Sequence, residues 1–188
     1  MAKVALVYHS GYGKTRIQAE RVAAGLSSVQ GVTVRVLTSE QAIADMSPLS
    51  EADCIVFGCP TYMGGPSAKF KEFIDAAGQI WLKQGWRDKL AAGFTNSGSP
   101  AGDKQSTLTA LMLNAMQHGM VWIGTGFNPH QVDHNGRKAT LNRLGFFLGA
   151  ASQAPHGSTQ PDEDDLLTAE AFGKRVAAAA LRWTKGRT

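Results

Sequence analysis

The chain has 188 residues, of which 43% are hydrophobic and 18% are charged, and its formal net charge is +4. This composition excludes a disordered or fibrous chain, and the length predicts one domain, 1–188, with a core of its own. The basic residues are scattered, which does not favour nucleic-acid binding. Cys54 and Cys59 are too few for a disulfide framework. There is no signal-peptide layout and no apolar run that could span a bilayer. We therefore expect a cytoplasmic protein with no membrane partner.

Five apolar runs predict β-strands along the chain. The first, third and fifth are almost continuously apolar, which is typical of strands in a parallel sheet that is buried on both faces. The five runs are 3-KVALVY-8, 32-VTVRVL-37, 53-DCIVFG-58, 90-LAAGFT-95 and 120-MVWIG-124.

Segments with helical periodicity alternate with these strands. The first helix is expected to begin near Thr15, and 39–52 predicts a short or irregular helix. A third helix is expected to begin at Pro66, because proline suits a first helical turn. The apolar faces of the three longer helices are Phe70, Phe73, Ile74, Ala77 and Trp81, then Leu108, Leu111, Met112 and Ala115, then Phe172, Val176, Ala179 and Trp183. This alternation predicts an α/β protein with a doubly wound sheet.

One connection is much longer than the others. Connections in α/β folds usually have about 2–6 residues, whereas 124–161 separates the fifth strand from the last helix. The segment contains 144-LGFFLGAA-151, which is too apolar for plain disorder. We expect an ordered excursion near the functional site or at a subunit interface.

The loop after the first strand, 9-HSGYGKT-15, is typical of a phosphate-binding turn, and three known types do not fit it. A P-loop needs a glycine where Tyr8 stands, so 13-GKT-15 supplies only its second half. A dinucleotide fingerprint needs a glycine where Arg16 stands. A receiver-type phosphorylation domain would need acidic residues at the ends of the first and third strands, and the sequence has none there.

Two interpretations of this loop remain. The first is a monophosphate bound at a helix N-terminus, with hydroxyls from Ser10 and Thr15 and a chain that curls at Gly11 and Gly13. The second is an ordinary polar turn with Thr15 near the N-cap. Lys14 either pairs with the phosphate or points to solvent.

Two further polar loops should lie beside this one. They are 59-CPTYMGGPS-67 after the third strand and 96-NSGSPAGD-103 after the fourth. Because ligands of doubly wound sheets bind outside the carboxyl ends of the strands, the three loops predict one pocket. We interpret it as a phosphate site beside a slot for a flat heteroaromatic ring.

Together the three loops resemble a known family. The combination looks like the FMN loops of the flavodoxin-like superfamily, and most closely those of WrbA-type NAD(P)H:quinone oxidoreductases and related FMN reductases. The resemblance implies a five-stranded parallel sheet in the order 2-1-3-4-5 with helices on both faces. The motifs that carry it are Ser10-x-Tyr12-Gly13-x-Thr15, Gly58-Cys59-Pro60-Thr61-Tyr62 and Asn96-Ser97-Gly98-Ser99.

The resemblance also implies the roles of individual residues. Residues 10–15 would bind the FMN phosphate, and 61–63 would flank the ribityl chain and the ring. Tyr12 would meet the nicotinamide cofactor, and Trp81 would lie near the substrate, although Trp81 also fits a core position. The implied FMN ligands are Ser10, Gly11, Tyr12, Gly13, Lys14, Thr15, Pro60, Thr61, Tyr62, Met63, Gly64, Asn96, Ser97, Gly98, Ser99, Ala101 and Gly102.

The chain departs from the family at several positions. Pro100 and Ala101 interrupt a loop that is richer in glycine in the family. Gln117 stands where the quinone reductases have a flavin-contacting histidine, and the link between the second and third strands is shorter. We interpret Cys59 as a small apolar residue. No metal site is expected, because His130, His134 and His156 lack the spacing of metal ligands.

These features favour an enzyme that moves a hydride from NAD(P)H through FMN to a quinone or similar small acceptor, with no protein side chain as catalytic group. The resemblance implies a homodimer or homotetramer. Two alternatives remain: a flavodoxin-type electron carrier, and an FMN-binding regulatory protein without turnover.

Overall fold

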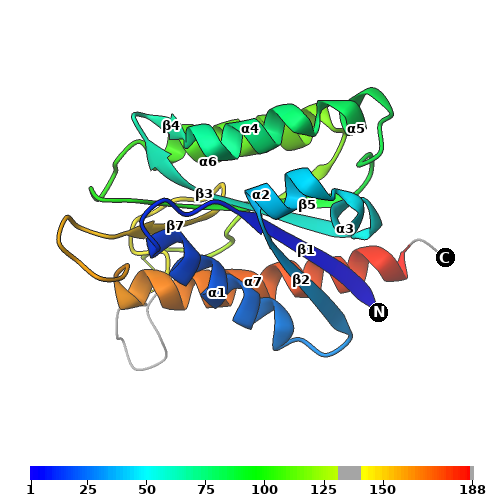
Figure 1. Cartoon of the computed structure of the whole chain (residues 1–188). Helices are drawn as coiled ribbons and strands as arrows, with labels where there is room; N and C mark the ends of the chain where they lie inside the picture. The colour runs from blue at the N-terminus through cyan, green and yellow to red at the C-terminus, as the bar shows by residue number, and fades with distance from the viewer. Residues whose placement is uncertain (131–140, 187–188) are drawn as a thin grey trace.

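Strands and helices alternate to form three layers, with the sheet between two layers of helices (Figure 1). The computed structural model describes residues 1–130 and 141–186. The strands are β1 (Ala2–Tyr8), β2 (Val32–Thr38), β3 (Cys54–Tyr62), β4 (Gly65–Pro66), β5 (Leu90–Ser97), β6 (Val121–Ile123) and β7 (Ala150–Gln153). The helices are α1 (Lys14–Ser27), α2 (Ser39–Ala44), α3 (Ser47–Glu51), α4 (Ala68–Ala76), α5 (Gly78–Leu82), α6 (Lys104–Gln117) and α7 (Glu163–Lys185). None of the helices in the described ranges is long and apolar enough to cross a membrane.

The five predicted strands occupy the expected positions. Their spatial order is β2-β1-β3-β5-β6, which is the predicted 2-1-3-4-5 order, and all their pairings are parallel. The predicted count of five strands is wrong, because β4 and β7 bring the number in the sheet to seven.

The seventh strand lies inside the long excursion. β6 pairs with β5 over Leu90–Ala92, and β7 pairs with it in parallel over Phe94–Ser97. The chain therefore leaves the sheet after β6 and returns as β7 to the same edge of β5, beside the next residues of that strand. Glycine is needed where it returns, since a Cβ on Gly149 would lie 2.1 Å from the carbonyl oxygen of Gly93. Residues 131–140, including His134, lie outside the described residues.

Each face of the sheet has its own buried core. On one face β1 and β3 contact α1 and α7, with Leu6, Leu26 and Phe172 among the fully buried side chains. On the other face the core lies under α2, α3, α4 and α6 (Figure 1). Its largest members are Phe57, Phe70, Phe73 and Trp86. Two apolar faces explain why the central strands are continuously apolar.

Some element bounds differ from those predicted. β3 runs four residues past Gly58 because its pairing with β5 continues to Pro60, and its last two residues, Thr61 and Tyr62, pair with β4. Pro66 lies in β4, and the helix begins two residues later, after the N-cap Ser67. The predicted helix to Trp81 is divided at Ala77 into α4 and α5.

Candidate cofactor and substrate site

The three polar loops meet at one hollow at the carboxyl edge of the sheet. The hollow has a volume of about 600 Å³, within the range of roughly 300–1,000 Å³ of ligand pockets. A fourth loop, which follows β7, completes the wall. The lining residues are Tyr12, Lys14, Thr15, Pro60, Thr61, Tyr62, Asn96, Ser97, Gly98, Ala154, His156 and Gly157.

The first loop leads into the N-terminus of α1. Gly13 is the N-cap with φ of 81°, a left-handed conformation that favours glycine. Ser10 Oγ accepts a hydrogen bond from the N–H of Arg16 at 3.1 Å, which leaves the Ser10 hydroxyl hydrogen available to donate. The first turn of α1 contains no acidic residue, and the N-cap glycine has no side chain that could accept a hydrogen bond from the first N–H groups. The positive end of the helix dipole therefore faces the hollow without an anion from its own turn.

Lys14 contacts the fourth loop. Its Nζ donates to the carbonyl oxygen of Pro155 at 3.2 Å, and the side chain also lines the hollow. The contact with Pro155 was not predicted, and the pairing of Lys14 with a phosphate stays a prediction. Thr15 is buried in the wall as the second residue of α1 rather than its N-cap.

The second loop is a tight hairpin between β3 and β4. Met63 and Gly64 have φ of 48° and 83°, so the two-residue turn has positive φ at both central positions. Tyr62 ends β3, and its ring meets the Tyr12 ring edge to face at 6.0 Å between centroids. Burial raises the pKa of Tyr62. The pair of tyrosines forms the aromatic side of the hollow, and Met63 is fully exposed on the hairpin.

Buried hydroxyls lie beneath the hairpin. Thr61 Oγ1 lies 2.9 Å from Thr95 Oγ1 and 2.7 Å from Thr107 Oγ1. Thr95 donates to the carbonyl oxygen of Cys59 at 2.7 Å. These bonds join β3, β5 and α6 under the hollow. Burial raises the pKa of the Cys59 thiol to about 12, so this cysteine is an inert small side chain, as its position in the strand suggested.

The third loop begins inside β5, where Asn96 is buried. Asn96 Nδ2 donates to Ser152 Oγ at 2.9 Å, and the N–H of Ala154 donates to the carbonyl oxygen of Ser97 at 2.9 Å. Gly102 has φ of 50°, and a Cβ there would lie 2.1 Å from Ser97 Oγ. The loop is therefore tightly folded between β5 and α6, and β7 fixes its first residues.

Sequence reasoning expected the excursion 124–161 near the functional site or at a subunit interface, but it named none of its residues as ligands. It also missed one buried side chain. Ala154, His156 and Gly157 line the hollow because β7 ends at the same edge as the other parallel strands. The sequence signal for this strand and loop was an apolar run that ends at Ala151 and is followed by polar residues. Lys104, fully buried under the third loop, had no signal in the sequence.

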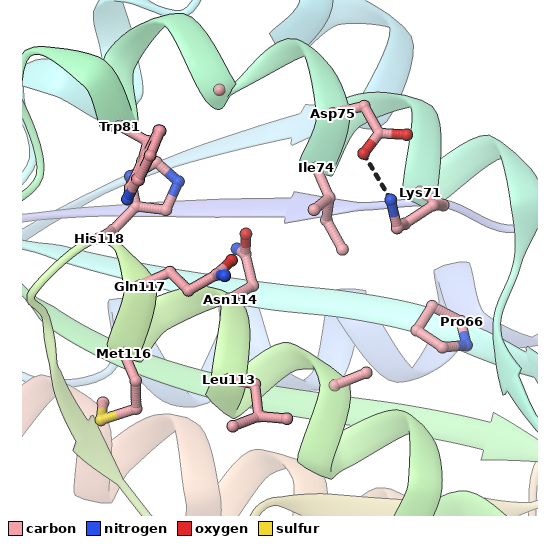
Figure 2. A pocket seen from close by; sticks show the side chains of 12 residues that line it. Pro66, Lys71, Ile74, Asp75, Trp81, Leu113, Asn114, Met116, Gln117 and His118 are labelled. Carbon is pink, nitrogen blue, oxygen red and sulfur yellow. Dashed lines mark hydrogen bonds and ion pairs between the residues drawn. The ribbon is translucent and has the colours of Figure 1, made fainter.

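Trp81 does not lie in this hollow. It lines a second hollow of about 1010 Å³ between α4–α5 and α6, together with Gln117 and His118 (Figure 2). The residues that line the two hollows are all different. Trp81 is 44% exposed, so the interpretation of this residue as part of the core is wrong. Within one chain the structure brings Tyr12, but not Trp81 or Gln117, to the three loops.

The described residues 1–130 and 141–186 contain no group of three or more His, Cys, Asp or Glu side chains that could hold a metal ion. The polar groups around the hollow are backbone N–H groups, hydroxyls, an amide, one lysine and the imidazole of His156. This set suits a phosphate and a flat polar ring.

A doubly wound parallel sheet with such a hollow at the carboxyl ends of its strands defines a flavodoxin-like protein, as predicted. The family model described as "NADPH-dependent FMN reductase" matches residues 39–133. The chain belongs to this family.

Similar proteins extend over the whole chain. "Flavodoxin FldP" of Pseudomonas aeruginosa is 37% identical over 94% of this chain and 96% of its own length. "NAD(P)H dehydrogenase (quinone)" of Archaeoglobus fulgidus is 32% identical over 96% of this chain and 98% of its own. The crystal structure of the "flavodoxin, WrbA-like protein" from Agrobacterium tumefaciens is 36% identical in sequence. The match covers 97% of this chain and 99% of that one, with a TM-score of 0.76. These findings confirm the predicted resemblance.

Proposed function

We propose that this chain is an FMN-dependent NAD(P)H oxidoreductase that delivers electrons to a quinone or a similar small acceptor. The observation that carries the proposal is the hollow where four loops meet, in a chain that belongs to the NADPH-dependent FMN reductase family. FMN, when bound, supplies a ring that accepts a hydride from the nicotinamide and gives it up to the acceptor. NAD(P)H is the co-substrate.

The N-terminus of α1 is the proposed phosphate site. The Ser10 hydroxyl still has a hydrogen to donate. The N–H groups of Lys14 and Thr15, the first two residues of α1, donate to no residue in the described part of the chain, and both residues line the hollow. Gly13 allows the chain to turn there without steric cost. Lys14 adds a positive charge to the wall while its Nζ links this loop to Pro155. An anion at this helix end is stabilised by about 0.3–1 kcal/mol from the dipole alone.

The ring would lie between the tyrosines and the third loop. Tyr62 and Tyr12 provide an aromatic wall, and the third loop presents backbone N–H groups at the opposite side. Such donors stabilise the negative charge that reduction places on the pyrimidine side of the ring. The proposed FMN ligands are the predicted ones, Ser10, Gly11, Tyr12, Gly13, Lys14, Thr15, Pro60, Thr61, Tyr62, Met63, Gly64, Asn96, Ser97, Gly98, Ser99, Ala101 and Gly102, with Ala154, His156 and Gly157 added.

Substrate binding involves two aromatic residues in this proposal. Tyr12 is 84% exposed at the mouth of the hollow, where a nicotinamide or quinone ring would enter. Trp81 lies in the other hollow of its own chain, so a contact with substrate requires a second chain. We therefore propose a homodimer or homotetramer. Exposed apolar side chains around the second hollow support it: Trp81, Leu113 and Met116 (Figure 2).

A flavodoxin-type electron carrier is the second candidate. The 37% identical relative carries the name flavodoxin, and a carrier would use the same FMN site without turning over a small acceptor. Two features favour the enzyme: the basic composition, with a pI of about 9.2, and the extra loop 154–157 that shapes the hollow. Carriers of the flavodoxin type are usually acidic. We further propose a cytoplasmic location, supported by two free, buried cysteines.

An anaerobic titration distinguishes these candidates. The purified protein, loaded with FMN, is mixed with NADH or NADPH, and the flavin absorbance near 450 nm is followed before a quinone is added. Rapid bleaching followed by quinone-dependent recovery supports the oxidoreductase. Bound FMN that neither nucleotide bleaches supports the carrier or the regulatory protein. Failure to bind FMN, or release of FAD as the main cofactor, overturns the whole proposal.

A further inference from the structure

Lys104 is a fully buried cation in an unusual place. It is the first residue of α6 and has no exposed surface. A positive charge at a helix N-terminus opposes the helix dipole, and burial removes its water. Desolvation accordingly lowers the pKa of Lys104 to about 8. A charge retained under these conditions needs strong local partners.

Those partners are backbone carbonyls of one loop. Lys104 Nζ lies 2.6 Å from the carbonyl oxygen of Ser99, 3.0 Å from that of Pro100 and 3.3 Å from that of Ala101. An ammonium group has three hydrogens, so each can be donated to one of these three consecutive carbonyls. The lysine lies inside the loop and draws its carbonyls inward.

The remaining surroundings of the ammonium offer weaker contacts. The ring of Phe146 lies 5.7 Å from Nζ, on the ordered part of the excursion. The charged groups whose fields reach Lys104 are Asp165 of α7 and Arg143, and these two form an ion pair with each other at 2.8 Å. Lys104 makes no direct ion pair with any described residue. Its hydrogen-bonding capacity is therefore committed to the loop.

The direction of these carbonyls fixes the direction of the loop's donors. In a trans peptide the C=O and the following N–H point in opposite directions, and the described residues contain no cis peptide. Carbonyls that point toward Lys104 therefore turn the N–H groups of Ala101 and Gly102 away from it, while Pro100 has no N–H. Neither of those N–H groups donates a hydrogen bond to any residue in the described part of the chain.

We propose that Lys104 is the positioning residue of the FMN site: by holding the carbonyls of residues 99–101 inward, it presents the N–H groups of Ala101 and Gly102 to the pyrimidine edge of the ring. This inference rests on the proposed function. It also explains how a loop with a proline and an alanine can hold one conformation with its donors free.

The first test compares Lys104→Met with a matched control, Lys69→Met. Methionine keeps most of the volume of the side chain but has no donor. Lys69 is an exposed lysine in the first turn of α4 that lines neither hollow and pairs with Glu72. We expect Lys104→Met to weaken FMN binding by the cofactor-free protein by about tenfold or more, because two hydrogen bonds to the ring lose their alignment. The control should change affinity less than twofold. Equal FMN affinity in Lys104→Met and wild type would overturn the positioning role.

The second readout is the reduction potential of bound FMN. The loop donors face charge that is present only after reduction, so their misalignment should weaken binding of reduced FMN more than that of oxidised FMN. A tenfold difference between the two forms lowers the two-electron potential by about 30 mV. A purely structural defect would weaken both forms equally and leave the potential unchanged, and that result would contradict the proposal. Lys104→Arg, which keeps the charge and the donors, should restore part of the potential.

If Lys104→Met does not fold, the wild-type protein still provides a test. Nitrogen-15 NMR of the lysine side chain should show slowly exchanging ammonium protons, coupled through hydrogen bonds to the carbonyl carbons of residues 99–101. A rapidly exchanging, uncoupled ammonium would overturn the proposal. If the wild-type protein does not bind FMN at all, the proposed function fails together with this inference. If the wild-type protein binds FMN but Lys104→Met binds it equally well, only the role of Lys104 is refuted.

Discussion

A Cβ placed on Gly11 would lie 2.6 Å from the hydroxyl oxygen of Tyr62. Because glycine has no side chain, the Tyr62 ring can pack closely against the first loop at this position. We expect Gly11→Ala to push this ring out of place and to weaken FMN binding by about three- to tenfold, the scale of one lost ring contact. Fluorescence titration of the cofactor-free protein with FMN measures the effect.

The matched control for Gly11→Ala is Gly78→Ala. A Cβ on Gly78 meets no atom within 4 Å, and Gly78 lies in α5, away from the tyrosines. This change should leave FMN affinity unaltered. Equal affinities in the two alanine variants would mean that the position of the Tyr62 ring does not matter for the cofactor.

Gly13→Ala separates backbone strain from cofactor contact. Gly13 has φ of 81° with open space around it, so an alanine would cost about 1–2 kcal/mol of folding free energy through its backbone conformation alone. Gly31, at φ of 87°, lies far along the chain, between α1 and β2, and Gly31→Ala should cost a similar amount. Urea unfolding of the cofactor-free proteins should show similar losses. FMN affinity should fall only in Gly13→Ala. If FMN affinity falls by the same amount in both variants, the first loop has no specific role in binding FMN and is an ordinary turn.

Two tryptophans that are five positions apart should behave differently. Trp86 is fully buried, with its ring 6.4 Å from that of Phe73 and 4.4 Å from that of His118. We expect Trp86→Ala to lower the free energy of unfolding by about 3–5 kcal/mol. Trp81→Ala should lower it by less than about 1 kcal/mol, because the side chain is half exposed. Thermal melts of the two variants measure the difference. If Trp81→Ala unfolds the protein, Trp81 contributes to the core after all.

The strands and their loops could be predicted from the sequence because both depend on short stretches of neighbouring residues. Continuous apolar runs such as 54–57 are buried on both faces, and glycine-rich polar loops follow the strands. Parallel strands then carry their loops to one edge. This sufficed to place the loops that begin at Ser10, Thr61 and Asn96 around one hollow.

The missed features depend on contacts between distant segments. β7 has only four residues, and it is a strand because Phe94–Ser97 leaves an open edge beyond the short β6. In the sequence Lys104 resembles a surface lysine, but in the structure the loop before it and Phe146 enclose its side chain. Trp81 continues the periodicity of α4, but the helix is divided at Ala77, and the short helix α5 that carries Trp81 has no buried residue. Periodicity describes one helix and does not report such a break.

His118 should make stability depend on pH. It is buried beside Trp86, and desolvation lowers its pKa below the ordinary value of 6.5. Between that lowered pKa and 6.5 the unfolded chain binds a proton that the folded chain does not. Acidification through this window therefore destabilises the fold, by up to about 1.4 kcal/mol per pH unit.

The comparison with His118→Phe isolates this contribution. Phenylalanine keeps a ring in the same place but does not titrate. Urea unfolding at pH 7.5 and 5.5 should show a larger loss of stability on acidification for wild type than for the variant. The same loss in both would show that His118 is not held neutral in the folded state, and a smaller loss in wild type would indicate a protonated, stabilised histidine.

The last expectation concerns the order of reaction. Tyr12 is exposed at the mouth of the hollow where the loops meet, and its ring contacts that of Tyr62 on the aromatic side of this hollow. With FMN filling the interior, a nicotinamide and a quinone must use the same open face, so they bind in turn. Initial rates against NAD(P)H at several quinone concentrations should give parallel lines. Tyr12→Ala should raise KM for both substrates together, by about two- to tenfold, since stacking contributes about 0.5–1.5 kcal/mol. Intersecting lines, or a rise in KM for only one substrate, would show that the two are bound at different places.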